Sequence, residues 1–202
     1  MSDRQSHSPR TNAELVRRFL DVVETDIVPL TEQGVASGNK VFGAALVAKS
    51  DLSLVLAATN NEMANPLWHG EMHALKLYYE LPEADRVPLK DCYFISTHEP
   101  CSMCLSAITW AGLDNFHYFF SHQNSRDMFA IPHDLRILKQ VFGLDADGYA
   151  KSNAFWQCRD LVADAKALQN PPTEQIDRIV ERYETMSANY QANKDQNAIP
   201  LA

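Results

Sequence analysis

The sequence is short of glycine, of cysteine and of long apolar runs. Its 202 residues include 7 Gly, 10 Pro and 4 Cys, which does not fit a collagen-like, low-complexity or disulfide-rich chain. The apolar run 41–48 is among the longest and falls far below the roughly 20 residues that span a bilayer. A chain of this length is expected to form one domain with a terminal extension, and it can bury a core without disulfide bonds.

Positive charge is also scarce. Lys and Arg number 18 against 26 Asp and Glu, a formal net charge of −8. Such a chain has no general attraction to phosphate backbones, so nucleic acid is a disfavoured partner. The N-terminal MSDRQSHSPR lacks the apolar stretch of a secretory signal, which predicts a cytoplasmic location. In that setting a close cysteine pair more often signals metal or redox chemistry than a structural disulfide.

The hydrophobic pattern alternates between strand and helix periods in the middle of the chain. Strands are predicted at 41–48, 52–57, 92–97 and 116–120, and helices at 12–25, from 69, from 100, at 135–142, at 155–168 and beyond 172. This order predicts an α/β fold with helices on both faces of the sheet. We find no convincing fifth strand. We expect a disordered segment 1–11, a domain over 12–145 and a helical extension over 146–202 that packs on the domain or on a partner subunit.

Two short motifs stand at the starts of two predicted helices. They are His69-Gly70-Glu71 and Pro100-Cys101-Ser102-Met103-Cys104. Cys101 and Cys104 are three residues apart, so their sulfurs share one helix face. The helix N-terminus stabilises thiolates, the form that binds metal. Helices leaving neighbouring strands on one side would bring both motifs to the carboxyl edge of the sheet, where ligands of open α/β sheets bind.

One imidazole and two thiolates can hold one zinc ion per chain and leave one coordination position open. Three protein ligands with an open position are typical of a catalytic zinc, which lowers the pKa of a bound water. Glu71 lies two residues beyond His69 and is predicted to act as the general acid and base. A lone Cys-x-x-Cys could instead be a redox pair, but that role leaves His69 and Glu71 without a function.

His73 is the alternative metal ligand, because it follows His69 by four residues. A fourth protein ligand would close the site, as in a zinc-stabilised interaction module without catalysis. The glutamate is at the wrong offset for a H-E-x-x-H motif. We therefore favour a packed or hydrogen-bonded His73, and keep the closed site as an alternative.

H-x-E followed by P-C-x-x-C resembles the signature of zinc-dependent nucleobase and nucleoside deaminases, the cytidine deaminase-like superfamily. The resemblance extends over about residues 12–145. The segment 99–111 is most similar to bacterial guanine deaminases, and His-Gly-Glu is similar to fungal cytosine deaminases. The resemblance implies a three-layer α/β/α fold with a central mixed sheet, and it implies a homodimer.

The same resemblance suggests four substrate-binding residues. Asn61, after the second strand, falls where the family places an asparagine that binds the substrate. Phe42 and Trp110 could wall the ring of the substrate, or could equally belong to the core. Asp134 matches, across a gap of two residues, an aspartate that recognises the purine ring in guanine deaminases. The chain departs from the family at Trp68 and has a shorter loop before His69. Because of these departures, the resemblance does not determine which substrate is bound.

The expected function is hydrolytic deamination of a guanine-like or cytosine-like nucleobase, or of a nucleoside, with release of ammonia. Deamination of adenosine in tRNA is the alternative within the same class of enzymes. The net charge of −8 and the lack of a Lys/Arg cluster near the motifs favour a small-molecule substrate over nucleic acid. We expect no contact with a membrane.

Overall fold

Five strands form one mixed sheet in the order β2-β1-β3-β4-β5. The computed structural model describes residues 12–145 and 148–201, so the predicted disordered segment 1–11 lies outside the described residues. The strands are β1 (Gly43–Ala48), β2 (Leu54–Thr59), β3 (Cys92–His98), β4 (Asn115–Phe120) and β5 (Gln157–Asp160). β1 pairs antiparallel with β2 and with β3, whereas β3, β4 and β5 pair in parallel.

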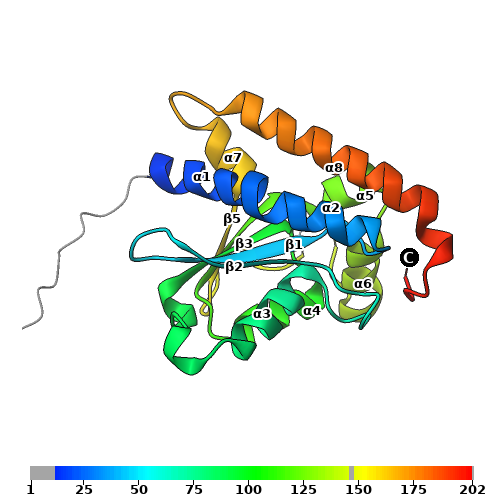
Figure 1. Ribbon diagram of the computed structural model, residues 1–202, viewed down its shortest axis with the longest axis horizontal. Helices are drawn as coiled ribbons and strands as arrows, with labels where there is room; N and C mark the ends of the chain where they lie inside the picture. Colours follow the sequence, from blue (N-terminus) through cyan, green and yellow to red (C-terminus); the bar gives the residue numbers. More distant parts are fainter. Residues whose placement is uncertain (1–11, 146–147, 202) are drawn as a thin grey trace, which may run out of the picture.

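Helices cover both faces of this sheet (Figure 1). One face carries α3 (Gly70–Glu80) and α4 (Ser102–Trp110), and the other carries α1 (Asn12–Asp21), α2 (Val28–Ala36), α7 (Leu161–Lys166) and α8 (Thr173–Asn193). Two further helices, α5 (His122–Asp127) and α6 (His133–Phe142), follow β4. The predicted α/β fold with helices on both faces is confirmed. Over residues 12–145 and 148–201, no helix is long and apolar enough to cross a membrane.

The inner strand β1 is buried along its whole length because both of its faces are covered. Successive side chains of a strand point to opposite faces. Accordingly, Ala45 and Val47 join the cluster under α1, α2 and α8, while Ala44 and Leu46 join the cluster under α3 and α4. A continuous apolar run is typical of a strand buried on both sides. The two cores therefore meet at β1.

The first helix is longer than predicted. The sequence predicts residues 12–25, but α1 continues through a π-helical segment (Val22–Ile27) into α2, which ends at Ala36. Pro29 lies in the first turn of α2, where it lacks an N–H and its ring crowds the preceding turn. A wider π-turn immediately before a proline relieves that conflict, and the helix continues across a residue expected to break it.

The prediction of a helix over 155–168 is wrong in its first half. Gln157–Asp160 form β5 beside β4, and only α7, at Leu161–Lys166, is helical in that stretch. Asp160 ends the strand and caps α7, since its carboxylate accepts from the backbone N–H of Ala163 at 2.9 Å. The fifth strand thus comes from the segment that the sequence assigns to a helical extension.

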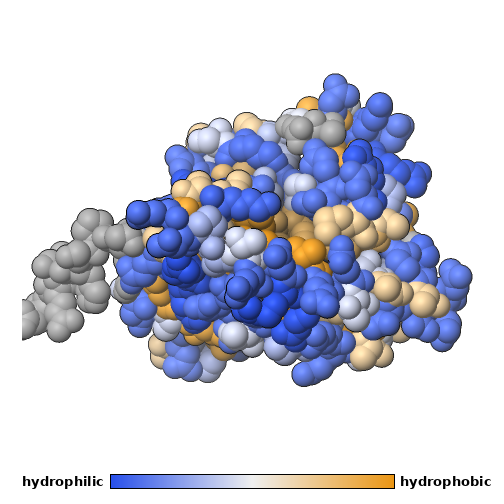
Figure 2. All heavy atoms as spheres, turned by 90° about the horizontal axis from the view of Figure 1, so that it is seen from above, coloured by the Kyte–Doolittle hydropathy of each residue, from blue (hydrophilic) through white to orange (hydrophobic). Residues whose placement is uncertain are grey.

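The helical face on the side of α1 and α8 is largely hydrophilic. Figure 2 shows that surface, with hydrophobic side chains visible in a hollow near its middle. Arg178 and Arg182 of α8 form ion pairs with Glu24 and Glu32 on the first helix. Pairs this exposed contribute little free energy. The buried side chains Tyr183 and Ile179 hold α8 in place instead.

His98 makes the stability of the fold depend on pH. Its ring lies 4.6 Å from the ring of Phe42, 4.9 Å from Phe120 and 5.1 Å from Phe129. Burial, with a smaller effect of His122, lowers the pKa of His98 to about 3. Below about pH 6.5 the His98 imidazole binds a proton in the unfolded chain but not in the folded chain. The free energy of unfolding therefore decreases as the pH falls toward 3.

We expect this effect to remove about 2 kcal/mol of the free energy of unfolding between pH 7 and pH 5. Urea unfolding at both values measures it. His98→Leu removes the titrating ring, so its stability should change less over the same interval. An equal loss in the wild-type protein and in this variant would contradict the assignment to His98.

Candidate functional site

The starts of α3 and α4 lie at the same edge of the sheet. β2 and β3 run in the same direction because each is antiparallel to β1, which lies between them. The sequence predicts that these two strands are neighbours, and that prediction is wrong because β1 separates them. They are nevertheless parallel to each other. Their carboxyl ends lead to His69 and to Cys101, the residues that cap the N-termini of α3 and α4.

The side chains of the three predicted metal ligands meet at this edge. The Nδ1 atom of His69 lies 3.6 Å from Sγ of Cys101 and 3.9 Å from Sγ of Cys104. One ligand atom from each residue falls within 4.8 Å of the others. This is the only such cluster of three metal-ligating residues among the described positions. Nitrogen and two sulfurs are a donor set that suits zinc.

A buried carboxylate fixes the start of α4. Oε2 of Glu99 accepts from the backbone N–H of His122 at 2.9 Å, and the backbone N–H of Glu99 donates to Phe120 at 2.7 Å. The side chains of Lys151 and Tyr149 also contact this carboxylate. Glu99 therefore connects the segment before Cys101 to the C-terminal end of β4 and to the segment that precedes β5.

The glycine between His69 and Glu71 is required by close packing. A Cβ atom at Gly70 would lie 2.6 Å from the Cα atom of Gly43 in β1. Backbone atoms cannot give way easily at that distance, so alanine does not fit without a shift. The motif His69-Gly70-Glu71 therefore has glycine at the position where the first turn of α3 rests on β1.

Glu71 is buried beside the cluster, 4 % exposed. The Ser96 hydroxyl lies 2.7 Å from Oε1 of Glu71 and 2.5 Å from the carbonyl oxygen of His98. Burial, followed by the charge of Cys101, raises the pKa of Glu71. These features suit a group that takes up and releases a proton.

The cluster fits a zinc ion by the chemistry of its donors. A hydrogen bond from Cys104, with His69 beside it, lowers the pKa of the Cys101 thiol well below its usual value. Burial lowers the pKa of His69, but contact with Cys101 outweighs burial and raises it to about 9. Metal binding must displace these protons, because thiolate and neutral imidazole are the ligating forms.

His73 does not complete the cluster as a fourth ligand. Its Nδ1 lies 2.7 Å from the carbonyl oxygen of Thr59, an acceptor, so this nitrogen donates. The ring stacks on Trp68 at 5.9 Å between centroids and 9° between planes. Trp68 in turn lies under Nζ of Lys76 at 4.9 Å. The bulky residue before His69 therefore packs outside the cluster and fixes His73 away from it.

A cavity of about 260 Å³ opens beside the cluster. Its walls are mostly apolar, with a few polar groups among them. The lining residues are Lys40, Phe42, Glu62, Pro66, Leu67, His69, Cys101, Ser102, Met103, Ile131, His133, Asp134, Ile137, Ile199, Pro200 and Leu201. An apolar cavity with a few convergent polar groups is typical of a small-molecule site.

Two of the four substrate-binding residues suggested by the sequence line this cavity. Phe42 forms a wall, and Asp134 lies in the first turn of α6. Burial, followed by the charge of Cys101, raises the pKa of Asp134 to about 7. Trp110, at the far end of α4, is 91 % exposed and is not part of the lining. Asn61 is also outside the lining, and its backbone N–H donates to Trp68 at 2.8 Å.

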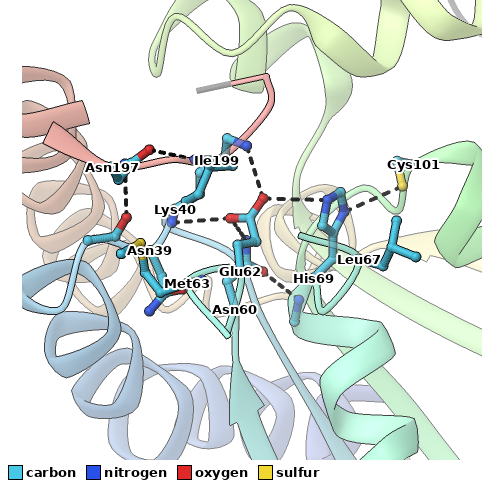
Figure 3. A network of polar contacts seen from close by, with 12 residues as sticks. Asn39, Lys40, Asn60, Glu62, Met63, Leu67, His69, Cys101, Asn197 and Ile199 are labelled. Carbon is cyan, nitrogen blue, oxygen red and sulfur yellow. Dashed lines mark hydrogen bonds and ion pairs between the residues drawn. The ribbon is translucent and has the colours of Figure 1, made fainter. Parts of the chain in front are cut away.

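The preceding residue, Asn60, is the asparagine that lies beside the cluster. It is 1 % exposed, and its Oδ1 accepts from the backbone N–H of Gly70 at 2.5 Å. Figure 3 shows Asn60 next to Glu62 and His69. The sequence reads Asn60-Asn61 at the end of β2, and nothing in that dipeptide alone indicates which side chain turns inward.

Sequence reasoning did not single out Lys40, Glu62 or Ile199. Lys40 and Glu62 are buried and form an ion pair of 2.9 Å, Nζ to Oε1. Ile199 closes the cavity from the C-terminal end of the chain, where Asn197 donates to the carbonyl oxygen of Gly38 at 3.1 Å. Lys40 precedes one predicted strand and Glu62 follows the next. Both lie in segments expected to be polar, so the sequence alone does not indicate that they are buried.

Comparison with known proteins gives a family match over the residues of this site. Residues 25–120 match the model of the cytidine and deoxycytidylate deaminase zinc-binding region. The match includes His69, Glu71, Cys101 and Cys104. Over these residues the chain is similar to the cytidine deaminase-like superfamily, as its motifs predict.

Individual relatives are more distant. A probable cytosine deaminase from Schizosaccharomyces pombe is 25% identical over 99 residues, which are 49% of this chain and 59% of that protein. The guanine deaminase of Bacillus subtilis is similar in structure, with a TM-score of 0.50 and 27% identity over 68% of this chain and 80% of that chain. The guanine deaminase of Nitrosomonas europaea shares the fold, with a TM-score of 0.55 and 19% identity over 90% and 89% of the chains.

Proposed function

We propose that this protein is a zinc-dependent hydrolytic deaminase of a free nucleobase, guanine-like or cytosine-like, that releases ammonia. The observation that carries the proposal is the meeting of His69, Cys101 and Cys104 with the buried carboxyl of Glu71 beside a small apolar cavity. Guanine and cytosine deaminases among the relatives support the same class of substrate.

Each part of the site has a role in this proposal. His69, Cys101 and Cys104 hold one zinc ion per chain, which when bound activates water for attack on a ring carbon. Glu71 takes the proton of the water, delivers it to the ring nitrogen and later helps the amine to leave. Phe42 packs against one face of the ring, and the apolar walls exclude bulk water, which strengthens the electrostatic interactions of Glu71.

The size of the cavity favours a free base. Its volume of about 260 Å³ lies below the range of roughly 300–1,000 Å³ that is usual for drug-sized ligands. Residues 199–201 form part of its wall, which leaves little room for a polynucleotide. Asp134 supplies an acceptor for a ring or exocyclic N–H group, and we propose it as the residue that orients the base.

We expect Asp134→Asn to raise KM by roughly 10–100-fold, since a hydrogen bond to a charged group contributes about 1.5–3 kcal/mol. The turnover number should change less, because Glu71 and the ligands remain. Initial rates of ammonia release over a range of base concentrations separate the two parameters. Asp127→Asn, which alters an exposed aspartate at the end of α5, is the control. An unchanged KM in Asp134→Asn would remove this residue from recognition.

Ammonia release from a panel of substrates tests the function. The panel contains guanine, cytosine, adenine, their nucleosides and aminated triazines, each with the zinc-loaded protein. We expect release from at least one free base at a higher kcat/KM than from its nucleoside. Silence across the panel would contradict the proposed activity and would leave a zinc-stabilised module as the function of the chain.

We also propose that the protein is a homodimer. Trp110 is 91 % exposed and Phe155 is 68 % exposed. The indole N–H of Trp156 donates to Thr109 at 2.8 Å, which brings the segment of Phe155 to the end of α4. Large apolar side chains exposed together favour a protein interface. Light scattering should give the mass of two chains.

A further inference from the structure

A buried carboxylate lies on the outer side of the ligand His69. Oε1 of Glu62 is 3.6 Å from Nε2 of His69, while Nδ1 of the same ring faces the two sulfurs. Figure 3 shows Glu62 between Lys40 and His69. A histidine that binds metal through Nδ1 must carry its hydrogen on Nε2, and a carboxylate is a common partner for that hydrogen.

Several contacts hold this carboxylate in one orientation. Asn60 donates to Oε2 of Glu62 at 2.7 Å, and Nζ of Lys40 lies 2.9 Å from Oε1. The backbone N–H of Lys40 is a further donor, 3.4 Å from Oε2. The side chains of Lys40 and Glu62 are only 6 % and 1 % exposed. Burying two charges is costly unless such contacts compensate for it.

The same network reaches the start of α3. Asn60 accepts from the backbone N–H of Gly70 through Oδ1 while its Nδ2 binds Glu62. The carboxylate is therefore fixed relative to the residue that follows His69. The distance of 3.6 Å is longer than a full hydrogen bond, so the interaction of Glu62 with the ring is mainly one of charge and orientation.

We propose that Glu62, held by Lys40 and Asn60, is a positioning residue for the metal ligand His69. Its carboxylate selects the tautomer with hydrogen on Nε2, directs Nδ1 toward the sulfurs and increases the affinity of the cluster for zinc. Lys40 balances the charge of Glu62 inside the protein. The inference rests on the zinc site of the proposed function and adds residues that the motifs do not contain.

A purely structural role is the competing explanation, because the ion pair also ties the segment before β1 to the loop after β2. Three variants separate the two: Glu62→Gln, Lys40→Met, and the double variant with both changes. If the pair is only a structural tie, the double variant should regain whatever the single variants lose, since no charge is left buried alone. If Glu62 positions His69, the double variant should remain impaired.

The measurement is the zinc dissociation constant, from competition with a chromophoric chelator, together with the melting temperature of the metal-free protein. We expect Glu62→Gln to weaken zinc binding roughly 10–100-fold, Lys40→Met to leave it within about threefold because the carboxylate remains, and the double variant to match Glu62→Gln. The melting temperature of the double variant should exceed those of the two single variants. Zinc affinity near the wild-type value in Glu62→Gln or in the double variant would overturn the proposal.

The wild-type protein provides a test that needs no variant to fold. Nitrogen NMR of the zinc-loaded chain should show His69 bound through Nδ1, with a slowly exchanging hydrogen on Nε2. Binding through Nε2 would overturn the proposal. Failure of the wild-type protein to bind zinc would count against the proposed function itself. Normal zinc binding with no effect of Glu62→Gln would count against this inference alone.

Discussion

Replacing Glu71 by glutamine should lower turnover by roughly 10²–10⁴-fold, the usual contribution of a positioned general acid and base. Glutamine keeps the size and the contact with Ser96 but cannot exchange a proton. The carboxyl is buried and adjoins Cys104, so bulk water offers no ready substitute. Ammonia release from the best base of the panel gives the rate, and elemental analysis gives the zinc content.

Zinc content should stay at one ion per chain in Glu71→Gln, because Glu71 is not part of the ligand cluster. Glu80→Gln is the matched control: it lies on the same helix, where its carboxylate pairs with Lys76 at the surface. Near-normal turnover in Glu71→Gln would exclude this residue from proton transfer. Loss of zinc would instead assign Glu71 to holding the metal.

Cys104→Ser should abolish turnover by removing the metal. Cys104 is fully buried, and serine is close to it in size, so the fold should persist while zinc affinity falls by more than roughly 100-fold, beyond the effect of losing an outer-shell partner. Zinc at 100 times the dissociation constant stabilises a protein by about 2.7 kcal/mol. The wild-type melting temperature should therefore rise with added zinc, and that of Cys104→Ser should not.

Cys92→Ser is the matched control for this prediction, because Cys92 is equally buried but lies on β3 away from the cluster. It should bind zinc like the wild-type protein. Full zinc occupancy in Cys104→Ser, with the same chelator resistance as the wild-type protein, would contradict the ligand assignment.

The ligand cluster could be predicted because its information is local. His69 and Cys101 each cap a helix, and a helix start is signalled by neighbouring residues. Cys104 follows from the helical spacing. The remaining requirement, that both helices start at one edge, follows from the alternation of strands and helices. The order of the strands could be wrong, as it was for β2 and β3, without moving the helix starts apart.

The cavity could not be predicted in the same way. Lys40, Glu62, Asp134 and Ile199 come from four separate parts of the chain, and their meeting depends on tertiary packing. Trp110 shows the same limit. It lies six residues beyond Cys104, about 9 Å farther along a helix that rises 1.5 Å per residue. A position in a motif does not show that this end of α4 leads away from the cluster.

The missed strand β5 has a related cause. Gln157–Asp160 is four residues long and mostly polar, with Gln157 and Arg159 exposed and the alternate residues only partly buried. It becomes a strand because β4 offers an unpaired edge, with the pairs Asn115 to Gln157 and Tyr118 to Asp160. Phe116 and Trp156 then pack with their ring centroids 4.9 Å apart. The sequence pattern predicts that the helix of α7 begins before Gln157, but pairing with β4 makes Gln157–Asp160 a strand instead.

The segment 199–201 has a practical consequence for the production of this protein. Ile199, Pro200 and Leu201 line the cavity, so an affinity tag attached directly after them would begin beside the site. The base would then compete with the tag for the cavity, and the measured rate of an active protein would be too low. A tag ahead of α1 leaves from the opposite end of the molecule (Figure 1). Assays should therefore use an N-terminal tag, or one that has been cleaved.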